Sequence, residues 1–288
     1  MSMLDRRRFL ASAAMACAAP ALVPSRGEAA GPARWRPAYM LGTSKGDILP
    51  DFKALKEAGF EGVELLSPNE LDRAEVLRAR DETGIVIHGV SGSRHWRDTL
   101  SDPDPAVVER GLAAIRQEID DCKAYGGTTV LVVPAVVTPQ VSYGEAWERS
   151  QKAIRTLIPL AEQAGVKLAI EEVWNRFLLS PLEFARYIDE FRSPAVGAYF
   201  DVGNVVEFGY PQEWIRTLGK RILKIHIKEY AKPKRFDYLL GEGKEIDWPA
   251  VRQALIDVGY DGWITAEVPK RDLADIVSRT KSLFPPAA

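Results

Sequence analysis

The sequence predicts a (β/α)8 barrel, a single α/β domain in which eight parallel strands alternate with eight helices. Short apolar runs rich in β-branched residues alternate eight times with longer amphipathic segments, the pattern of repeated strand–helix units. The units occupy residues 36–285, close to the ~250 residues that this TIM-barrel fold needs. The competing fold, a doubly wound open sheet, usually has a G-x-G-x-x-G loop after its first strand, and residues 42–46 (GTSKG) lack that spacing.

The order of elements follows from apolar runs, helix starts and helix stops. Strands are expected at 38–43, 61–66, 85–90, 128–134, 166–171, 196–201, 222–227 and 262–267. Helices are expected at 49–58, 72–82, 105–125, 144–164, 181–192, 211–218, 248–258 and 270–282. Pro105 and Pro181 suit a first helical turn, where the N–H group is unpaired in any case. Glycine permits the left-handed end of a helix. It follows five of these helices, at Gly59, Gly84, Gly126, Gly165 and Gly259.

The first 30 residues predict a signal peptide of the twin-arginine type. Three arginines at 6–8 precede Phe-Leu at 9–10, and an apolar run of Ala, Leu, Met and Val follows. Cleavage is expected after Ala29 or Ala30. An amphipathic first helix is the alternative, but this segment has no polar periodicity. The leader predicts export, to the periplasm in a bacterium, and leaves 36–285 as one domain.

Composition excludes several classes of protein. The net charge of −2 becomes −4 without residues 1–30, which hold four Arg and two acidic residues, so nucleic acid is not an expected partner. Beyond the leader, no run of about 20 apolar residues predicts a membrane span. Cys17 lies in the leader, and Cys122 alone can form neither an internal disulfide nor a cysteine zinc site. Composition neither predicts nor excludes that the protein forms a homo-oligomer.

Polar side chains stand at the ends of the last four expected strands. They are Glu171, Asp201, His226 and Glu267. A barrel brings its strand ends together at one face. Burying an unpaired carboxylate costs several kcal/mol or forces its protonation, and a shared divalent cation removes that cost. Three carboxylates and one imidazole suit a single Mn²⁺, Mg²⁺ or Co²⁺ ion, and Zn²⁺ also fits.

Each of these four residues also has a structural alternative. A strand-end carboxylate can face solvent, start an Asx turn or form a surface ion pair, and a histidine in an apolar strand can be a core residue. Their shared position on consecutive strands favours a common metal. Glu172 is the alternative to Glu171, because the alternation of side chains along a strand lets only one of them face the barrel axis.

Five segments carry a resemblance to a known family. They are 170–189 (IEEVWNRFLLSPLEFARYID), 200–204 (FDVGN), 224–230 (KIHIKEY), 240–248 (LGEGKEIDW) and 266–269 (AEVP). The chain resembles the xylose isomerase-like TIM barrels grouped as sugar phosphate isomerases/epimerases, which include D-tagatose 3-epimerase and hydroxypyruvate isomerase and are related to endonuclease IV. The resemblance implies a metal held by Glu171, Asp201, His226 and Glu267. It also implies that the two glutamates are the catalytic acid and base, on opposite faces of the substrate.

The chain departs from the family pattern in its histidines. Epimerases of this group often have His three residues after the metal-binding Asp, and this chain has Asn204 there, so the resemblance does not carry over one substrate contact or a second metal. The whole chain has only three histidines, so the three-metal site of endonuclease IV-like enzymes is not expected.

Substrate contacts are expected from side chains around the strand ends. The candidates are His88, His95, Trp96, Trp174, Asn175, Arg176, Asn204 and Lys228. His95 and Trp96 would form a stacking wall for a sugar, whereas Lys228 would contact an anionic oxygen or pair with a carboxylate. Each also has an ordinary packing role as its alternative. Glu64, in GVELL, is expected to be structural rather than part of the pocket floor.

These residues together predict a metal-dependent isomerase or epimerase of a keto sugar or related carbohydrate. The metal would polarise the carbonyl and stabilise an enediolate, while one glutamate removes the α-proton and the other returns a proton. A lyase that cleaves 3-oxo-glycosides would use the same enolisation. A non-catalytic sugar-binding barrel is the alternative of another class. No phosphate-binding loop is visible in the sequence, so a phosphorylated substrate is not required.

Overall fold

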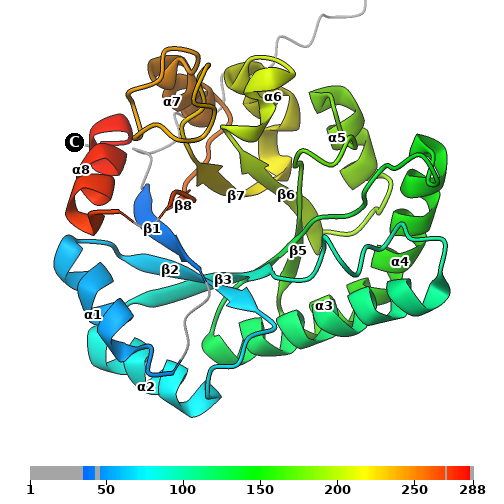
Figure 1. The fold of residues 1–288 in the computed structure, drawn as a ribbon, viewed down its shortest axis with the longest axis horizontal. Helices are drawn as coiled ribbons and strands as arrows, with labels where there is room; N and C mark the ends of the chain where they lie inside the picture. The colour runs from blue at the N-terminus through cyan, green and yellow to red at the C-terminus, as the bar shows by residue number, and fades with distance from the viewer. Residues whose placement is uncertain (1–34, 43–45, 270, 286–288) are drawn as a thin grey trace, which may run out of the picture. The chain divides into compact units, whose positions relative to one another are not determined.

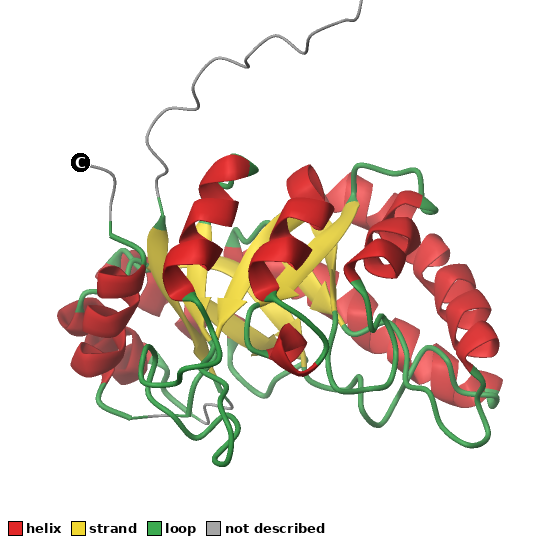
Figure 2. Ribbon diagram, turned by 90° about the horizontal axis from the view of Figure 1, so that it is seen from above, coloured by secondary structure: helices red, strands yellow, loops and turns green. Residues whose placement is uncertain are grey.

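The computed structural model describes residues 35–42, 46–269 and 271–285. In these residues eight parallel strands close into a barrel in the order β1 to β8, and β1 pairs with β8. Figure 1 shows the helices arranged around this barrel, and Figure 2 shows the strands enclosed by them. The predicted (β/α)8 barrel is therefore confirmed. The expected signal peptide at 1–30 lies outside the described residues.

The element bounds follow the predicted order. The strands are β1 (Arg36–Leu41), β2 (Gly62–Ser67), β3 (Val86–Gly92), β4 (Thr129–Val132), β5 (Lys167–Glu171), β6 (Val196–Asp201), β7 (Ile222–Ile227) and β8 (Trp263–Ala266). The α-helices are α1 (Leu49–Ala58), α2 (Arg73–Thr83), α3 (Pro105–Tyr125), α4 (Tyr143–Ala164), α5 (Pro181–Asp189), α6 (Pro211–Leu218), α7 (Trp248–Asp257) and α8 (Leu273–Leu283). Two short 3₁₀ helices are η1 (Asn204–Glu207) and η2 (Gly219–Arg221).

The predicted bounds were wrong at some ends, for local reasons. Strand β4 stops at Val132 rather than at 134, where proline has no N–H to donate to a sheet. Helix α8 begins three residues late, because the Asp272 side chain caps it by accepting from the Ala274 N–H. Helix α7 ends at Asp257, with Val258 as its C-cap, and Gly259 follows with a φ of 71°.

The hydrophobic core has two parts. The larger part packs the outer faces of the strands against the helices and includes fully buried Phe52 and Trp214. A small apolar cluster inside the barrel includes Leu131 and Tyr199. The rest of the interior holds polar contacts between strands that are not neighbours, such as Glu64 of β2 with Tyr199 of β6. The barrel interior is therefore filled, and its chemistry lies at the strand ends.

No helix in the described part of the chain combines the length and the apolar character that crossing a bilayer requires.

Candidate metal centre

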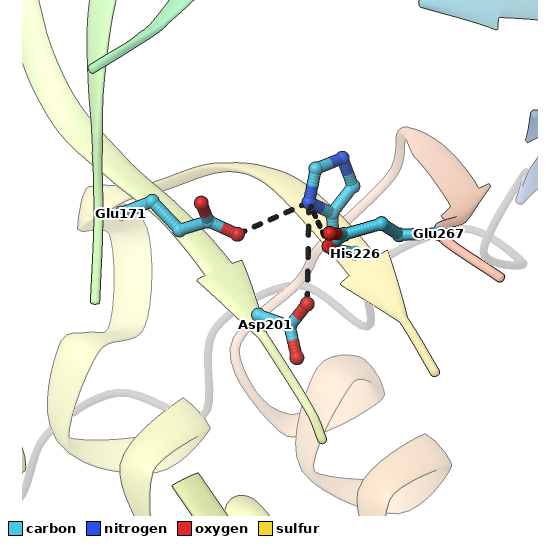
Figure 3. A group of neighbouring side chains, drawn as sticks. All are labelled: Glu171, Asp201, His226 and Glu267. Carbon is cyan, nitrogen blue, oxygen red and sulfur yellow. Dashed lines mark hydrogen bonds and ion pairs between the residues drawn. The ribbon is translucent and has the colours of Figure 1, made fainter. Parts of the chain in front are cut away.

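Four side chains converge at the carboxyl ends of β5 to β8. Ligand atoms of Glu171, Asp201, His226 and Glu267 all lie within 4.8 Å of one another. The Nδ1 atom of His226 is 3.1 Å from a carboxylate oxygen of Glu171, 3.1 Å from one of Glu267 and 4.0 Å from one of Asp201. Figure 3 shows these carboxylates approaching the same ring nitrogen from different directions. The structure thus brings together the four residues that the sequence predicted as metal ligands.

Strand register accounts for this convergence. Asp201 and His226 are direct partners in the β6–β7 pairing. Glu171 is the last residue of β5 and pairs with Tyr199, two residues before Asp201. Glu267 follows β8, and its backbone N–H donates to the Ile227 carbonyl at 3.0 Å, so it continues the pairing with β7. Parallel strands therefore deliver all four side chains to one end of the barrel.

A buried hydrogen-bond frame fixes the orientation of Asp201. Its Oδ1 atom accepts from the Asn204 N–H at 2.8 Å, and its own N–H donates to Glu172 Oε1 at 2.9 Å. The Asn204 side chain donates to the Glu172 carbonyl at 2.9 Å. Glu172 therefore supports Asp201 from outside the cluster, while Glu171 faces into it, as the alternation along the strand requires.

Lys228 adds a cation to the cluster. Its Nζ atom lies 2.9 Å from Glu267 Oε2 and 3.1 Å from Asp201 Oδ2. The Lys228 side chain lies against the backbone of the FDVGN segment. A Cβ on Gly203 would lie 2.6 Å from Lys228 Cγ, which explains the glycine at this position. Lys228 thus forms ion pairs with two of the carboxylates, and carboxylate pairing was one of the two roles expected for it from the sequence.

Burial has the largest single effect on the pKa of each carboxylate in the cluster, and the charges of neighbouring residues decide whether the pKa rises or falls. Burial raises the pKa of Glu171 to about 7, against an opposing hydrogen bond from His226. Burial also raises the pKa of Asp201 to about 6, with Lys228 opposing it. For Glu267 the charges of Lys228 and His226 outweigh burial and hold the pKa far below its usual range. The two glutamates therefore differ: burial dominates the pKa of Glu171, whereas the neighbouring cations dominate the pKa of Glu267.

The donor set fits a divalent cation. Asp201 Oδ2 is buried and has no hydrogen-bond partner among the described residues, although Lys228 approaches it as an ion pair. Three carboxylates and one imidazole are hard and borderline ligands that suit Mn²⁺, Mg²⁺, Co²⁺ or Zn²⁺. Such an ion, held by these four residues, would supply the positive charge that offsets repulsion among the carboxylates.

Some of the predicted substrate residues lie beside the cluster. The Trp174 indole donates to the Asn204 carbonyl at 2.9 Å, and its ring contacts Phe236 with centroids 5.1 Å apart. The guanidinium of Arg235 lies 4.2 Å from the centre of the Trp174 ring. Phe236 also faces the Lys228 ammonium at 5.3 Å. Trp174, Arg235 and Phe236 therefore form an aromatic and cationic wall next to Lys228.

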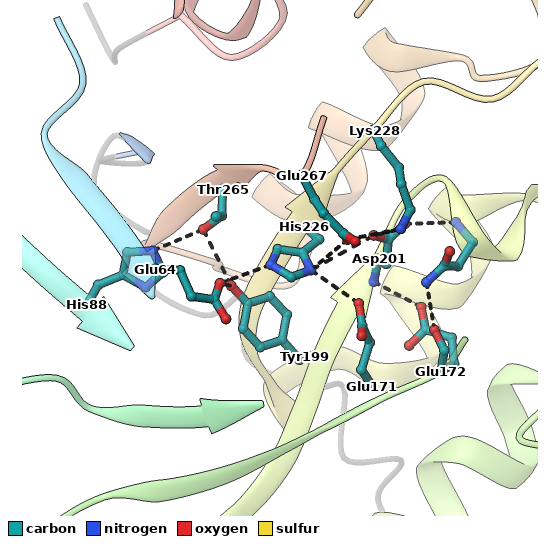
Figure 4. A network of polar contacts seen from close by, with 11 residues as sticks. Glu64, His88, Glu171, Glu172, Tyr199, Asp201, His226, Lys228, Thr265 and Glu267 are labelled. Carbon is teal, nitrogen blue, oxygen red and sulfur yellow. Dashed lines mark hydrogen bonds and ion pairs between the residues drawn. The ribbon is translucent and has the colours of Figure 1, made fainter. Parts of the chain in front are cut away.

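Other predicted substrate residues are held by the fold. The buried Asn175 amide donates to the Ala135 carbonyl at 2.7 Å, and its oxygen accepts from the Phe177 N–H at 3.1 Å, so it shapes its own loop. Arg176 follows in a left-handed backbone conformation with a φ of 62°. His88 is buried within the barrel, where it contacts Thr265 Oγ1 at 3.2 Å. Other polar side chains lie between His88 and the carboxylates of Glu171, Asp201 and Glu267 (Figure 4).

The loop after β3 places its two aromatic residues differently. The His95 side chain is half-buried, and burial lowers its pKa although Glu267 opposes the shift. Trp96 is 58% exposed, with its ring 5.3 Å from that of His95. His95 is therefore partly covered by the protein, whereas Trp96 lies open to solvent.

Sequence analysis missed three neighbours of the cluster. Tyr199 lies two residues before Asp201 and shares its strand face, a signal that alternation in AYFD contains. Arg235 and Phe236 sit in the loop after β7, where no periodic pattern predicts which side chains turn inward.

Comparisons with known proteins agree with this architecture. A family model described as "Xylose isomerase-like TIM barrel" matches residues 52–284. The chain is 27% identical to the L-ribulose-5-phosphate 3-epimerase UlaE of Escherichia coli over 240 residues, or 76% of this chain and 84% of that one. It is 29% identical to the 2-epi-5-epi-valiolone 7-phosphate 2-epimerase of an Actinoplanes species over 175 residues, 60% of this chain and 61% of that one.

Solved structures share the fold. The apo 3-keto-D-glucoside 4-epimerase YcjR of E. coli superposes with a TM-score of 0.73 at 20% identity, covering 87% of this chain and 99% of that one. A D-psicose 3-epimerase crystallised with D-fructose gives a TM-score of 0.69 at 18% identity and covers 87% of this chain and 90% of that one.

Proposed function

The chain belongs to the xylose isomerase-like TIM barrel family, and from this premise we propose that it is a metal-dependent epimerase or isomerase of a keto sugar or related carbohydrate. The observation that carries the proposal is the meeting of Glu171, Asp201, His226 and Glu267 within 4.8 Å at the carboxyl end of the barrel. The curated relatives in the comparison are named as epimerases of sugar phosphates and of a cyclitol phosphate, which supports the reaction class.

The chain's own residues divide the work. A divalent ion held by the four residues would supply Lewis-acid polarisation of the substrate carbonyl and charge stabilisation of an enediolate. One of the two glutamates, Glu171 or Glu267, takes the proton from the carbon next to the carbonyl. The other glutamate returns a proton to the opposite face or to the neighbouring carbon. Asp201 and His226 serve as ligands.

The wall of Trp174, Arg235 and Phe236 would position the substrate. An aromatic face packs against the C–H side of a sugar ring, and Lys228 and Arg235 can donate to its oxygens or to an anionic group. This arrangement accepts a free keto sugar, a glycoside or a phosphorylated sugar, so the substrate panel must contain all three.

Proton exchange with solvent tests the proposal directly. The protein is incubated in D₂O with L-ribulose 5-phosphate, D-tagatose, D-fructose and a 3-keto-glucoside, each with Mn²⁺, Mg²⁺ or Co²⁺. We expect deuterium at the carbon next to the carbonyl and a new isomer by NMR for at least one substrate. Release of a free aglycone from the keto-glycoside would instead identify a lyase, and tight binding with no exchange would identify a sugar-binding barrel.

Two variants assign the roles. Glu171→Gln and Glu267→Gln should each lower turnover by about 10²–10⁴-fold, the usual contribution of a positioned acid or base. Glu213→Gln is the matched control, because that carboxylate is exposed on α6 and pairs only with Arg216 among the described partners. Turnover unchanged by Glu267→Gln would reject the assignment.

A further inference from the structure

His226 directs its two ring nitrogens to opposite sets of partners. The Nδ1 atom faces Glu171 and Glu267, each at 3.1 Å. The Nε2 atom faces Glu64 Oε2 at 2.9 Å. Glu64 comes from β2, on the other side of the barrel from β7, and is completely buried. Figure 4 shows Glu64 on the far side of the imidazole from the three carboxylates of the cluster.

Glu64 belongs to a buried polar chain beneath the cluster. Its Oε2 atom also accepts from the Tyr199 hydroxyl at 2.5 Å. Tyr199 lies 3.4 Å from Thr265 Oγ1, which is 3.2 Å from His88 Nε2. Each of these side chains is at most 3% exposed. Solvent therefore does not compete for the Glu64 contact, and the protein alone decides where the carboxylate points.

Hydrogen-bond roles then fix the tautomer of His226. Glu64 Oε2 already accepts a hydrogen bond from the Tyr199 hydroxyl, and the same oxygen faces Nε2 as an acceptor, so the hydrogen between Glu64 and His226 lies on Nε2. Nδ1, which faces the three carboxylates, is then the nitrogen that gives up its hydrogen when a cation binds among them, because a metal ligand must offer a free lone pair. A carboxylate that accepts from the distal N–H also makes the imidazole a stronger ligand and prevents the ring from turning.

We propose that Glu64 is the positioning residue of the metal centre, holding His226 as the Nε2–H tautomer with Nδ1 directed at the ion. This inference rests on the proposed metal dependence and adds a residue from outside the ligand set. Outer partners of this kind change metal affinity by roughly 10–100-fold when they are replaced. Glu64 lies outside the group of four ligand residues and would act through His226.

The first experiment measures metal affinity. Mn²⁺ is titrated into the chelator-stripped protein, and free ion is followed by electron paramagnetic resonance. We expect Glu64→Gln to weaken Mn²⁺ binding by roughly 10–100-fold. Tyr199→Phe is the matched control: it removes the second bond to the same oxygen but keeps the Glu64 carboxylate and its His226 contact, and should change affinity by less than threefold. Equal affinity of Glu64→Gln and wild type would overturn the proposal.

The second experiment needs no variant at Glu64. The chain has only three histidines, so ¹⁵N-histidine labelling gives a spectrum in which His88→Gln and His95→Gln identify the remaining ring. With diamagnetic Zn²⁺ bound, we expect His226 to keep a proton on Nε2 and to lose it from Nδ1. The opposite tautomer would overturn the proposal even if Glu64→Gln failed to fold.

The proposed metal dependence and the positioning role of Glu64 can be refuted separately. If wild type binds none of these metals, the proposed function falls, while the metal-free spectrum still tests whether Nε2 carries the proton toward Glu64. If wild type binds metal and the Glu64 result is negative, the proposed function stands without this positioning role.

Discussion

Lys228 keeps the carboxylate cluster together when no other cation is near. Its ammonium lies within 3.1 Å of oxygens of both Asp201 and Glu267, and its side chain is only 14% exposed. Burial by itself would lower the pKa of Lys228, but the charges of Asp201 and Glu267 raise it far above the usual value. Lys228 therefore stays charged at physiological pH and offsets part of the repulsion between the carboxylates.

Replacing Lys228 should make the protein depend on metal for stability. Lys228→Met leaves buried Asp201 and partly exposed Glu267 without their cation, and breaking a buried pair such as the one with Asp201 costs about 3–5 kcal/mol. We expect a clear fall in Tm in the presence of a chelator, and recovery in saturating Mn²⁺, because ligand binding stabilises the folded state. Differential scanning calorimetry with and without Mn²⁺ measures both.

The control for Lys228→Met is Lys232→Met. Lys232 is largely exposed and pairs with Glu207 at 3.5 Å, and surface pairs contribute only about 0–1 kcal/mol. An unchanged Tm of Lys228→Met in chelator would show that the ion pairs with Asp201 and Glu267 do not stabilise the cluster.

At the scale of elements, a single carboxylate holds the long β7–α7 connection. Glu229 is completely buried and accepts from the Gly241 N–H at 2.7 Å, the Trp248 indole at 3.0 Å and the Tyr230 N–H at 3.2 Å. These bonds tie both ends of the loop that carries Arg235 and Phe236 to the barrel. A Cβ on Gly243 would lie 2.5 Å from the same carboxylate, so glycine is needed there for close approach.

Removing this carboxylate should release the loop without unfolding the barrel. Glu229→Ala leaves several buried donors unpaired, at about 1–3 kcal/mol for each group, which predicts roughly tenfold or faster tryptic cleavage after Lys234, Arg235 or Lys244. Mass spectrometry of timed digests identifies the cut. Glu242→Ala removes an exposed partner of Arg279 in the same loop and should leave the rate unchanged. Equal cleavage of both variants would contradict the role of Glu229.

At the scale of the whole molecule, barrel closure decides which residues can meet. Glu64 and His226 are 162 positions apart, and only closure of the sheet between β1 and β8 brings β2 opposite β7. The same closure sets the four ligands at one face and the polar chain of Glu64, Tyr199, Thr265 and His88 beneath them. Glu64 is thus supplied by a part of the sequence remote from His226, whereas Tyr199 and Thr265 each lie two residues before a ligand.

For the chain as a whole we also propose export through the twin-arginine route, directed by residues 1–30. The basic cluster at 6–8 ahead of an apolar run motivates it. Changing Arg6, Arg7 and Arg8 together to lysine keeps the charge, and should leave an uncleaved chain in the cytoplasm of a bacterial host. Immunoblots of periplasmic and cytoplasmic fractions measure the outcome. Equal export of both forms would contradict a twin-arginine signal.

Much of the fold was readable from the sequence because local patterns govern it. Alternating apolar periods predicted the eight strands and eight helices in order, and proline, aspartate and glycine marked most helix ends within a few residues. Asp104 caps α3 and Gly126 ends it with a φ of 83°, both through contacts within a few residues. The ligand candidates were readable for a related reason: a carboxylate that interrupts an apolar strand needs a partner.

The sequence by itself determined the barrel, the face that carries the chemistry, and four residues able to meet there. Tertiary structure alone decided that Glu171 rather than Glu172 faces the cluster, that Lys228 pairs with two of its carboxylates, and that Glu64 holds the distal nitrogen of His226. The physical reason is the distance along the chain over which each effect acts. Backbone propensities and caps act over a few residues, whereas contacts across a barrel depend on register, twist and closure that every strand sets together.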